Sequence, residues 1–83
     1  MKHYIIKYKK QAIKFIESRS HDEQERLLTA ISNLPCCSNI KKMEGYEHRY
    51  RLRTGDYRVI YDQYDDYLLI LVLKIGSRGD VYK

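Results

Sequence analysis

The hydrophobic pattern of the N-terminal part changes from strand-like at residues 3–8 to helical spacing after them. The stretch HYIIKY, residues 3–8, is aromatic and β-branched, which predicts a strand. Ser20, with Glu23 three residues later, forms a capping box that begins a second helix near His21, and Pro35 ends that helix. The apolar positions with helical spacing are Ala12, Ile13, Phe15 and Ile16, then Leu27, Leu28, Ile31 and Leu34. The pattern predicts a strand followed by a hairpin of two helices.

Strand-like alternation follows in the second half. Residues 36–45 have no clear period and predict a connecting loop. Residues 47–53, 57–64 and 67–75 predict three strands, and the turn-forming sequences TGD and DD between them predict an antiparallel meander. The expected fold class is therefore α+β: an antiparallel sheet in the order β-α-α-β-β-β, with the helical hairpin on one face, in a single domain over residues 1–83.

Composition narrows the choice of partner and compartment. The 83 residues carry a formal charge of +5, which favours a polyanion, an acidic protein or an anionic surface as partner. The longest apolar run, residues 67–73, is too short to span a membrane, and no secretory signal follows Met1, so we expect a cytoplasmic protein. Cys36 and Cys37 are adjacent, which is too tight for an ordinary disulfide, and they lack the second pair of a zinc site.

The stretch YRLRTGDYRVIYDQY places cations on one side of the predicted meander. Arg51 and Arg53 point together because strand residues two apart share a face, while Leu52 points the other way. A tight turn at TGD would bring Arg58 beside them. If Leu52 faces the helices, the three guanidiniums face water, where their planar forks suit phosphate oxygens. The alternative is a solvated charged face without a ligand.

The C-terminal stretch KIGSRGDVYK adds further cations at the end of the last strand. It contains Lys74, Arg78, Tyr82 and Lys83, and its glycines let the chain bend back towards the arginines. An exposed tyrosine beside cations is suited to stacking on an unpaired base. Packing of Tyr82 into the small core is the alternative.

The motifs YRLRTGDYRVIY and IGSRGDVYK, with the order of elements over the whole chain, resemble the RelE/ParE superfamily of toxins, closest to the RelE branch. The resemblance implies a ribosome-dependent endoribonuclease that cuts mRNA in the ribosomal A site by 2′-OH attack on the phosphodiester and so inhibits translation. It implies no metal and no cofactor. It assigns catalysis to Arg53, Arg58, Arg78 and Tyr82, and contacts with mRNA and 16S rRNA to Arg51, Lys74, Lys83, Lys41 and Lys42.

Two positions depart from the pattern of that branch. Some relatives carry lysine at the second-strand positions, where this chain has Arg51 and Arg53. Arginine stays protonated, so Arg53 is a poor general base. His48, Glu47, Tyr50 and Lys74 lie nearby in the sequence, and of these His48 is the possible base. Each of the four could equally be an ordinary strand or loop residue. Ser77 stands where many relatives have histidine, which removes one possible acid. Catalysis would then depend mostly on positioning by the ribosome.

The resemblance also implies a cognate antitoxin protein. Acidic residues on an antitoxin helix or strand would neutralise Arg51, Arg58 and Arg78, or the antitoxin would displace the C-terminal stretch. Two other functions remain open for this fold. One is inhibition of DNA gyrase, as in ParE-like relatives, and the other is RNA binding without catalysis.

Overall fold

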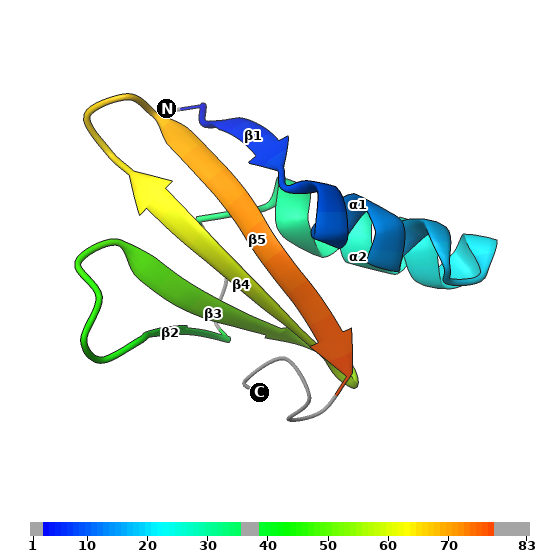
Figure 1. Cartoon of the computed structure of the whole chain (residues 1–83). Coiled ribbons are helices and arrows are strands. Elements are labelled where there is room, and N and C mark those ends of the chain that lie inside the picture. Colours follow the sequence, from blue (N-terminus) through cyan, green and yellow to red (C-terminus); the bar gives the residue numbers. More distant parts are fainter. Residues whose placement is uncertain (1–2, 36–38, 78–83) are drawn as a thin grey trace.

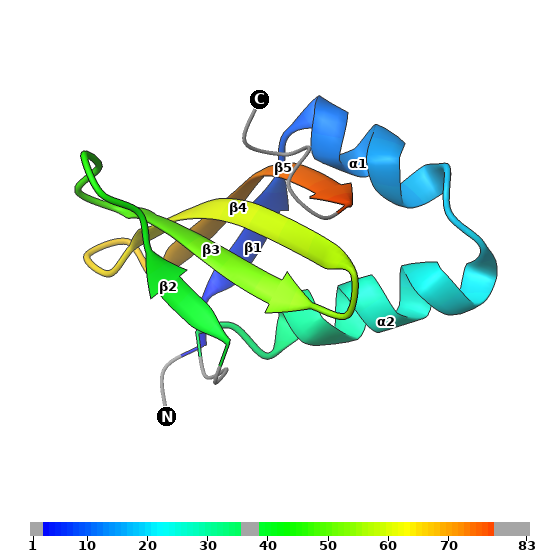
Figure 2. The same cartoon turned by 90° about the horizontal axis from the view of Figure 1, so that it is seen from below.

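The computed structural model describes residues 3–35 and 39–77, which form two helices and a five-stranded sheet. Along the chain the elements are β1 (Ile5–Tyr8), α1 (Lys10–Glu17), α2 (His21–Ser32), β2 (Ile40–Lys42), β3 (Arg49–Thr54), β4 (Tyr57–Tyr64) and β5 (Leu69–Ser77). The strand order is β1-β5-β4-β3-β2. Figures 1 and 2 show the two helices as a hairpin on one side of the twisted sheet, with α1 beside β5. The predicted fold class is confirmed.

The sheet is mixed. The β3–β4–β5 meander is antiparallel as predicted, but β1 lies parallel to β5, with Ile5 opposite Leu69 and Tyr8 opposite Val72. Parallel neighbours need a crossover connection, and the helical hairpin begins the long path from β1 back to β5. The sheet therefore brings the first and last described strands together.

The prediction of a loop over residues 36–45 was wrong for its second half. Residues 40–42 form β2, which pairs antiparallel with β3 so that Ile40 lies opposite Leu52. A strand of three residues is too short to show a period, so only its pairing with β3 reveals it.

The helices follow their sequence signals. The Ser20 side chain accepts a hydrogen bond from the backbone N–H of Glu23 at 3.3 Å, which confirms the predicted cap of α2. Ile13 and Leu28, which the periodicity assigned to the buried faces, are instead exposed. No helix in residues 3–35 and 39–77 is long and apolar enough to cross a membrane.

The core lies between the helices and one face of the sheet, which we call the core face. Its fully buried residues come from α1, α2, β4 and β5, and the list is Ala12, Leu27, Ile31, Val59, Tyr61, Ile70 and Val72. Leu52 of β3 is 2% exposed in the same cluster. The arginines that alternate with Leu52 therefore point to the opposite face, as predicted.

Candidate nucleic-acid interface

The strand register places the predicted cations on the opposite face, which we call the arginine face. Thr54 pairs with Tyr57 around a two-residue turn, and Gly55 at its first position has φ of 58°, a left-handed conformation that favours glycine. This turn sets Arg53 directly opposite Arg58. Residues directly opposite on antiparallel strands have Cβ atoms about 5 Å apart on the same face. The two arginine side chains therefore start from neighbouring positions on this face.

The face is organised in three rows across β3, β4 and β5. The rows are Arg53–Arg58–Gly76, then Arg51–Ile60–Lys74, then Arg49–Asp62–Leu71. A bulge in β5 between the last two rows leaves Leu73 without an opposite residue on β4. Successive rows are two residues apart along a strand, so about 7 Å separates them.

The third row is neutralised within the protein. Arg49 binds Asp62 through two hydrogen bonds, Nε to Oδ1 at 2.8 Å and Nη2 to Oδ2 at 3.2 Å, and the Tyr64 hydroxyl donates to the same carboxylate at 3.4 Å. The Arg49 guanidinium also lies 4.4 Å from the centre of the Tyr46 ring. The hydrogen bond to Asp62, more than any other contact, raises the pKa of Arg49 above its ordinary value.

The first row has no such compensation. Within residues 3–35 and 39–77, neither Arg53 nor Arg58 forms an ion pair with a carboxylate. Arg53 is exposed, and Arg58, which is half-buried, donates from Nη1 to the backbone carbonyl of Tyr57 at 3.3 Å. Two positive charges on adjacent positions repel each other when no carboxylate compensates them, and a bound phosphate would relieve that repulsion.

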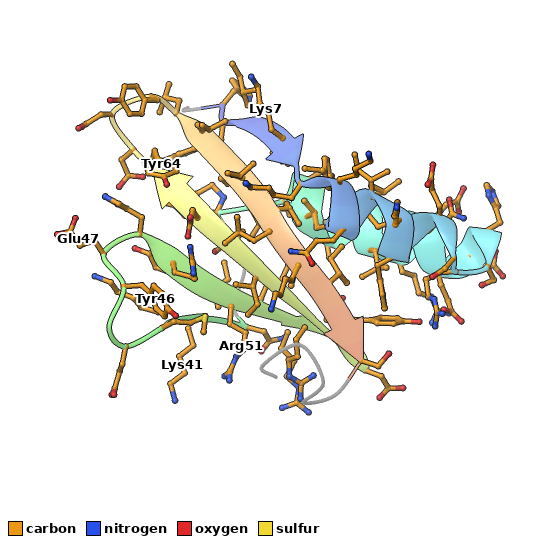
Figure 3. All side chains as sticks on the ribbon, in the orientation of Figure 1. Lys7, Lys41, Tyr46, Glu47, Arg51 and Tyr64 are labelled. Carbon is orange, nitrogen blue, oxygen red and sulfur yellow. The ribbon has the colours of Figure 1, made fainter. Side chains whose placement is uncertain are left out.

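The lysines of β2 divide between the two faces. Lys41 lies opposite Arg51 and shares the arginine face, whereas Lys42 lies opposite Tyr50 and belongs by register to the core-face side. Figure 3 shows Lys41 on the edge strand β2 and Arg51 on its neighbour β3. Side chains one residue apart on a strand point to opposite faces. Of the two lysines, only Lys41 therefore lies on the face of the predicted interface. Lys74 lies opposite Ile60, next to the arginine pair.

His48 lies at the wrong end of the sheet for a general base at Arg58. Its backbone carbonyl accepts a hydrogen bond from the N–H of Gln63, five residues beyond Arg58 along β4, so about 17 Å separates the two positions. The ring stacks against Tyr64 at 5.0 Å and lies 3.6 Å from the Glu47 carboxylate. His48 therefore lies far from the arginine pair, and its role as the base stays a prediction. Arg78, Tyr82 and Lys83 lie outside the described residues.

Comparison with known proteins identifies the family. The model of the family described as "ParE toxin of type II toxin-antitoxin system, parDE" matches residues 2–82. The chain belongs to the RelE/ParE superfamily of type II toxins. An archaeal RelE in a RelE–RelB complex from Pyrococcus horikoshii OT3 is 30% identical, with a TM-score of 0.77, and the match covers 96% of this chain and 99% of that one.

Two more distant RelE structures share the fold of this RelE/ParE toxin. The RelBE2 toxin–antitoxin complex from Mycobacterium tuberculosis contains a chain with 16% identity and a TM-score of 0.76, over 92% of this toxin and 99% of that chain. The isolated Escherichia coli RelE toxin has 22% identity and a TM-score of 0.71, over 95% and 90% of the two chains. A search of curated protein sequences gives no match.

The structure of this RelE/ParE toxin adds residues that the sequence did not single out. Arg49 and Tyr46 form the neutralised end of the arginine face, and the only sequence signal for them was the alternation of Arg49 with Arg51. Asp62, the ion-pair partner of Arg49, is identified only by strand register. No group of three or more His, Cys, Asp or Glu side chains that could hold a metal occurs in the described residues.

Proposed function

We propose that this toxin is a ribosome-dependent endoribonuclease that cuts mRNA in the A site and thereby stops translation. The observation that carries the proposal is the pair Arg53 and Arg58, directly opposite each other on the arginine face and without carboxylate partners among the described residues. Arg51 and Lys74 in the next row, and Lys41 beyond Arg51, extend the positive charge along the path of an RNA backbone.

The proposed reaction is an internal transesterification. The ribose 2′-oxygen loses its proton and forms a bond to the adjacent phosphorus, the bond from phosphorus to the 5′-oxygen breaks, and that oxygen gains a proton. The products are a 2′,3′-cyclic phosphate and a free 5′-hydroxyl. Arg58 and Arg53 donate hydrogen bonds to the phosphate oxygens, whose negative charge grows in the transition state. Such donors contribute most when they are held in place beforehand. The Arg58 guanidinium is held by its hydrogen bond to the backbone carbonyl of Tyr57.

Proton removal is proposed to depend on the ribosome. An arginine guanidinium is a poor general base, and His48 lies about 17 Å from the Arg58 position by strand register. The ribosome would hold the message in a bent conformation with the 2′-oxygen aligned for attack, which supplies part of the rate by positioning alone. Arg78 and Tyr82 keep their proposed roles as charge stabiliser or proton donor and as base-stacking residue. Free RNA should accordingly be a poor substrate.

A protein antitoxin is the proposed second partner. The relative from Pyrococcus horikoshii was solved with RelB, and the Mycobacterium tuberculosis relative was solved in a toxin–antitoxin complex. For this chain, we propose an antitoxin segment with acidic side chains that covers Arg53 and Arg58, because opposite charges there would relieve the repulsion described above. Bound antitoxin would then compete with RNA for the same face.

Inhibition of DNA gyrase is the second candidate function. It is favoured by the family model, which is the ParE model. The arginine face favours RNA over this candidate because gyrase inhibition requires no pair of uncompensated phosphate-binding side chains. A non-catalytic RNA-binding module is the third reading, since phosphate contacts alone need no acid or base.

One experiment separates these functions. Purified toxin is added to a translating extract, and primer extension maps breaks in the message, while a parallel reaction measures supercoiling by gyrase. Discrete breaks at A-site codons with normal supercoiling support the nuclease. Inhibited supercoiling with an intact message supports the gyrase function. Ribosome association with neither breaks nor gyrase inhibition supports the binding module and overturns the proposal.

A further inference from the structure

A pocket of about 360 Å³ lies on the arginine face, and of its lining only Lys74 belongs to the RNA contacts proposed above. It reaches from the beginning of α1, across β5 and β4, to the loop between β2 and β3. Its apolar lining comes from Met43, Ile60 and Leu73. A volume near the lower end of the usual range for small-molecule sites suits one nucleotide and is too small for a folded segment of protein.

The polar lining of this pocket is cationic. Lys9 and Lys74 line it, and within residues 3–35 and 39–77 neither is in an ion pair. The side-chain amide of Gln11, also in the lining, has both a donor and an acceptor and can therefore pair with the edge of a base. The two ammonium groups suit a phosphate.

Tyr46 and Arg49 supply a flat aromatic and guanidinium surface for the same pocket. Both residues line it, and the Arg49 guanidinium lies 4.4 Å from the Tyr46 ring centre. Two hydrogen bonds to Asp62 hold that guanidinium in place. The Tyr46 ring is 48% exposed, although it belongs to a preformed stack. Figure 3 shows Tyr46 between β2 and β3, on the side of the face away from β5. Bases stack on surfaces of this kind without regard to sequence.

The pocket adjoins the arginine pair. Ile60 and Lys74 occupy the row next to the one that holds Arg53 and Arg58, so about 7 Å of strand separates the pocket from the proposed phosphate site. Because of this spacing, a strand of RNA that places one phosphate at the arginines would bring a neighbouring nucleotide to the pocket.

We propose that this pocket binds one unpaired nucleotide of RNA beside the phosphodiester at the arginine pair. Its base stacks on Tyr46 and Arg49 over the apolar lining, its edge pairs with Gln11, and its phosphate lies between Lys9 and Lys74. The inference rests on the proposed function, since it assumes RNA on this face. It adds a base-binding subsite formed partly by α1, which would give the toxin a preference at one nucleotide next to the cut.

The test compares matched variants in binding to RNA. Lys9→Ala is paired with Lys10→Ala, which removes the same charge one residue away and outside the pocket lining. Tyr46→Ala is paired with Tyr67→Ala, since Tyr67 is an exposed tyrosine outside the pocket lining. Affinity is measured by fluorescence anisotropy with a labelled single-stranded RNA, and by co-sedimentation with ribosomes that carry the same message.

Tyr46→Ala should weaken binding by about tenfold, as the loss of one stacked base predicts. Lys9→Ala should lower the slope of log affinity against log salt by about 0.7, the value for one phosphate contact with a single strand. Lys10→Ala and Tyr67→Ala should leave both quantities unchanged. Equal effects of Lys9→Ala and Lys10→Ala, together with equal effects of the two tyrosine variants, would overturn the subsite.

Photocrosslinking identifies the source of the nucleotide. The message, or in a second arm the 16S rRNA, carries 4-thiouridine, and mass spectrometry maps the crosslinked peptide. A crosslink at Tyr46 from either RNA supports the subsite and names its source, and crosslinks confined to other parts of the toxin contradict it. If the wild type still breaks mRNA on the ribosome in that case, the proposed function stands without the subsite. A wild type that neither binds nor cuts in any arm overturns both.

Discussion

The two faces of the sheet are formed by the same three strands, but one face packs in the core and the other carries the arginines. On the core face, Val59, Tyr61, Ile70 and Val72 are fully buried against the helices. On the arginine face, one residue along the same strands, Arg51, Arg53 and Arg58 point away from that core. Because side chains alternate along a strand, stability and binding are separated by a single step in sequence. Substitutions at neighbouring positions should therefore have effects of different kinds.

The arginine face is itself divided. At the start of β3, Arg49 is held by Asp62, whose side chain is only 11% exposed, and by the ring of Tyr46. At the end of β3, Arg53 faces Arg58 with no carboxylate partner among the described residues. The ion pair of Arg49 with Asp62 stabilises one end of the sheet. The positive charges of Arg53 and Arg58 remain available to bind an anionic ligand. Arginine on this face is therefore structural or functional according to its cross-strand partner.

The largest effect should come from the core face. Ile70→Ala removes a fully buried side chain and leaves a cavity, so it should lower the free energy of unfolding by about 2–5 kcal/mol. Leu71→Ala, on the next residue and the opposite face, is the control and should cost much less because Leu71 is already half-exposed. Urea denaturation measures both. Equal losses would contradict the separation of the two faces.

The second prediction concerns the arginine pair. Arg58→Ala should lower ribosome-dependent cleavage by about 100-fold, the usual result of losing one preorganised donor to the reacting group. Its unfolding free energy should change little, since the side chain has no carboxylate partner within the described residues. Arg26→Ala, at an exposed arginine on α2, is the control for charge. Primer extension on a translated message supplies the rates, and a loss of the same size in both variants would show a general effect of charge.

The third prediction tests the neutralised end of the face. Asp62→Asn keeps the shape of the side chain but removes its charge, and it leaves Arg49 without its ion pair. The expected cost is about 1–2 kcal/mol of unfolding free energy, at the low end for charged hydrogen bonds because the Arg49 side chain is 30% exposed. Thermal or urea unfolding measures it, with Asp66→Asn at an exposed turn position as the control. An unchanged free energy of unfolding would mean that the ion pair between Arg49 and Asp62 does not stabilise the fold.

The smallest effect should appear at high pH, where the sheet meets α2. The Tyr57 hydroxyl donates a hydrogen bond to Glu23, and this bond, with a smaller contribution from burial, raises the pKa of Tyr57 above the ordinary 10.0. Because the folded-state pKa is the higher one, the stabilisation is complete below pH 10 and is lost as pH rises through the folded value. Tyr57→Phe should therefore be less stable than wild type below pH 10, and the gap should narrow above it.

Urea denaturation on both sides of pH 10 measures that gap. Tyr67→Phe is the control, because Tyr67 is 75% exposed, and it should match the wild type at each pH. A gap between wild type and Tyr57→Phe that stays constant across the range would show that the hydrogen bond to Glu23 does not couple to ionisation.

Much of the fold was predictable because its signals are local. The capping box at Ser20, the turn at Gly55 and the alternation around Leu52 each depend on residues close together in sequence, and the structure confirms all three. The predicted strand 57–64 has the bounds of β4. The strand predicted at 67–75 begins later, because Leu68 has a φ of 51° and the turn continues through it.

The candidate site was predictable only in part. Its face and its pair Arg53–Arg58 followed from a period of two and a tight turn, since both are set within one hairpin. The pairing of Arg49 with Asp62 and the positions of Lys42 and His48 depended on register across neighbouring strands. A shift of one residue in register moves every side chain of a strand to the other face. The sequence pattern therefore could not place these residues.

The sequence by itself determined the order of the elements and the identity of the face on which the arginines lie, because hydrophobic period and turn chemistry act over a few residues. Only the tertiary structure decided that β2 joins the sheet, that β1 lies parallel to β5, and that Lys9 and Gln11 meet Tyr46 around one pocket. These arrangements join residues far apart along the chain. They form because pairing and burial of whole elements stabilise them. No local sequence pattern predicts which of these elements will pack together.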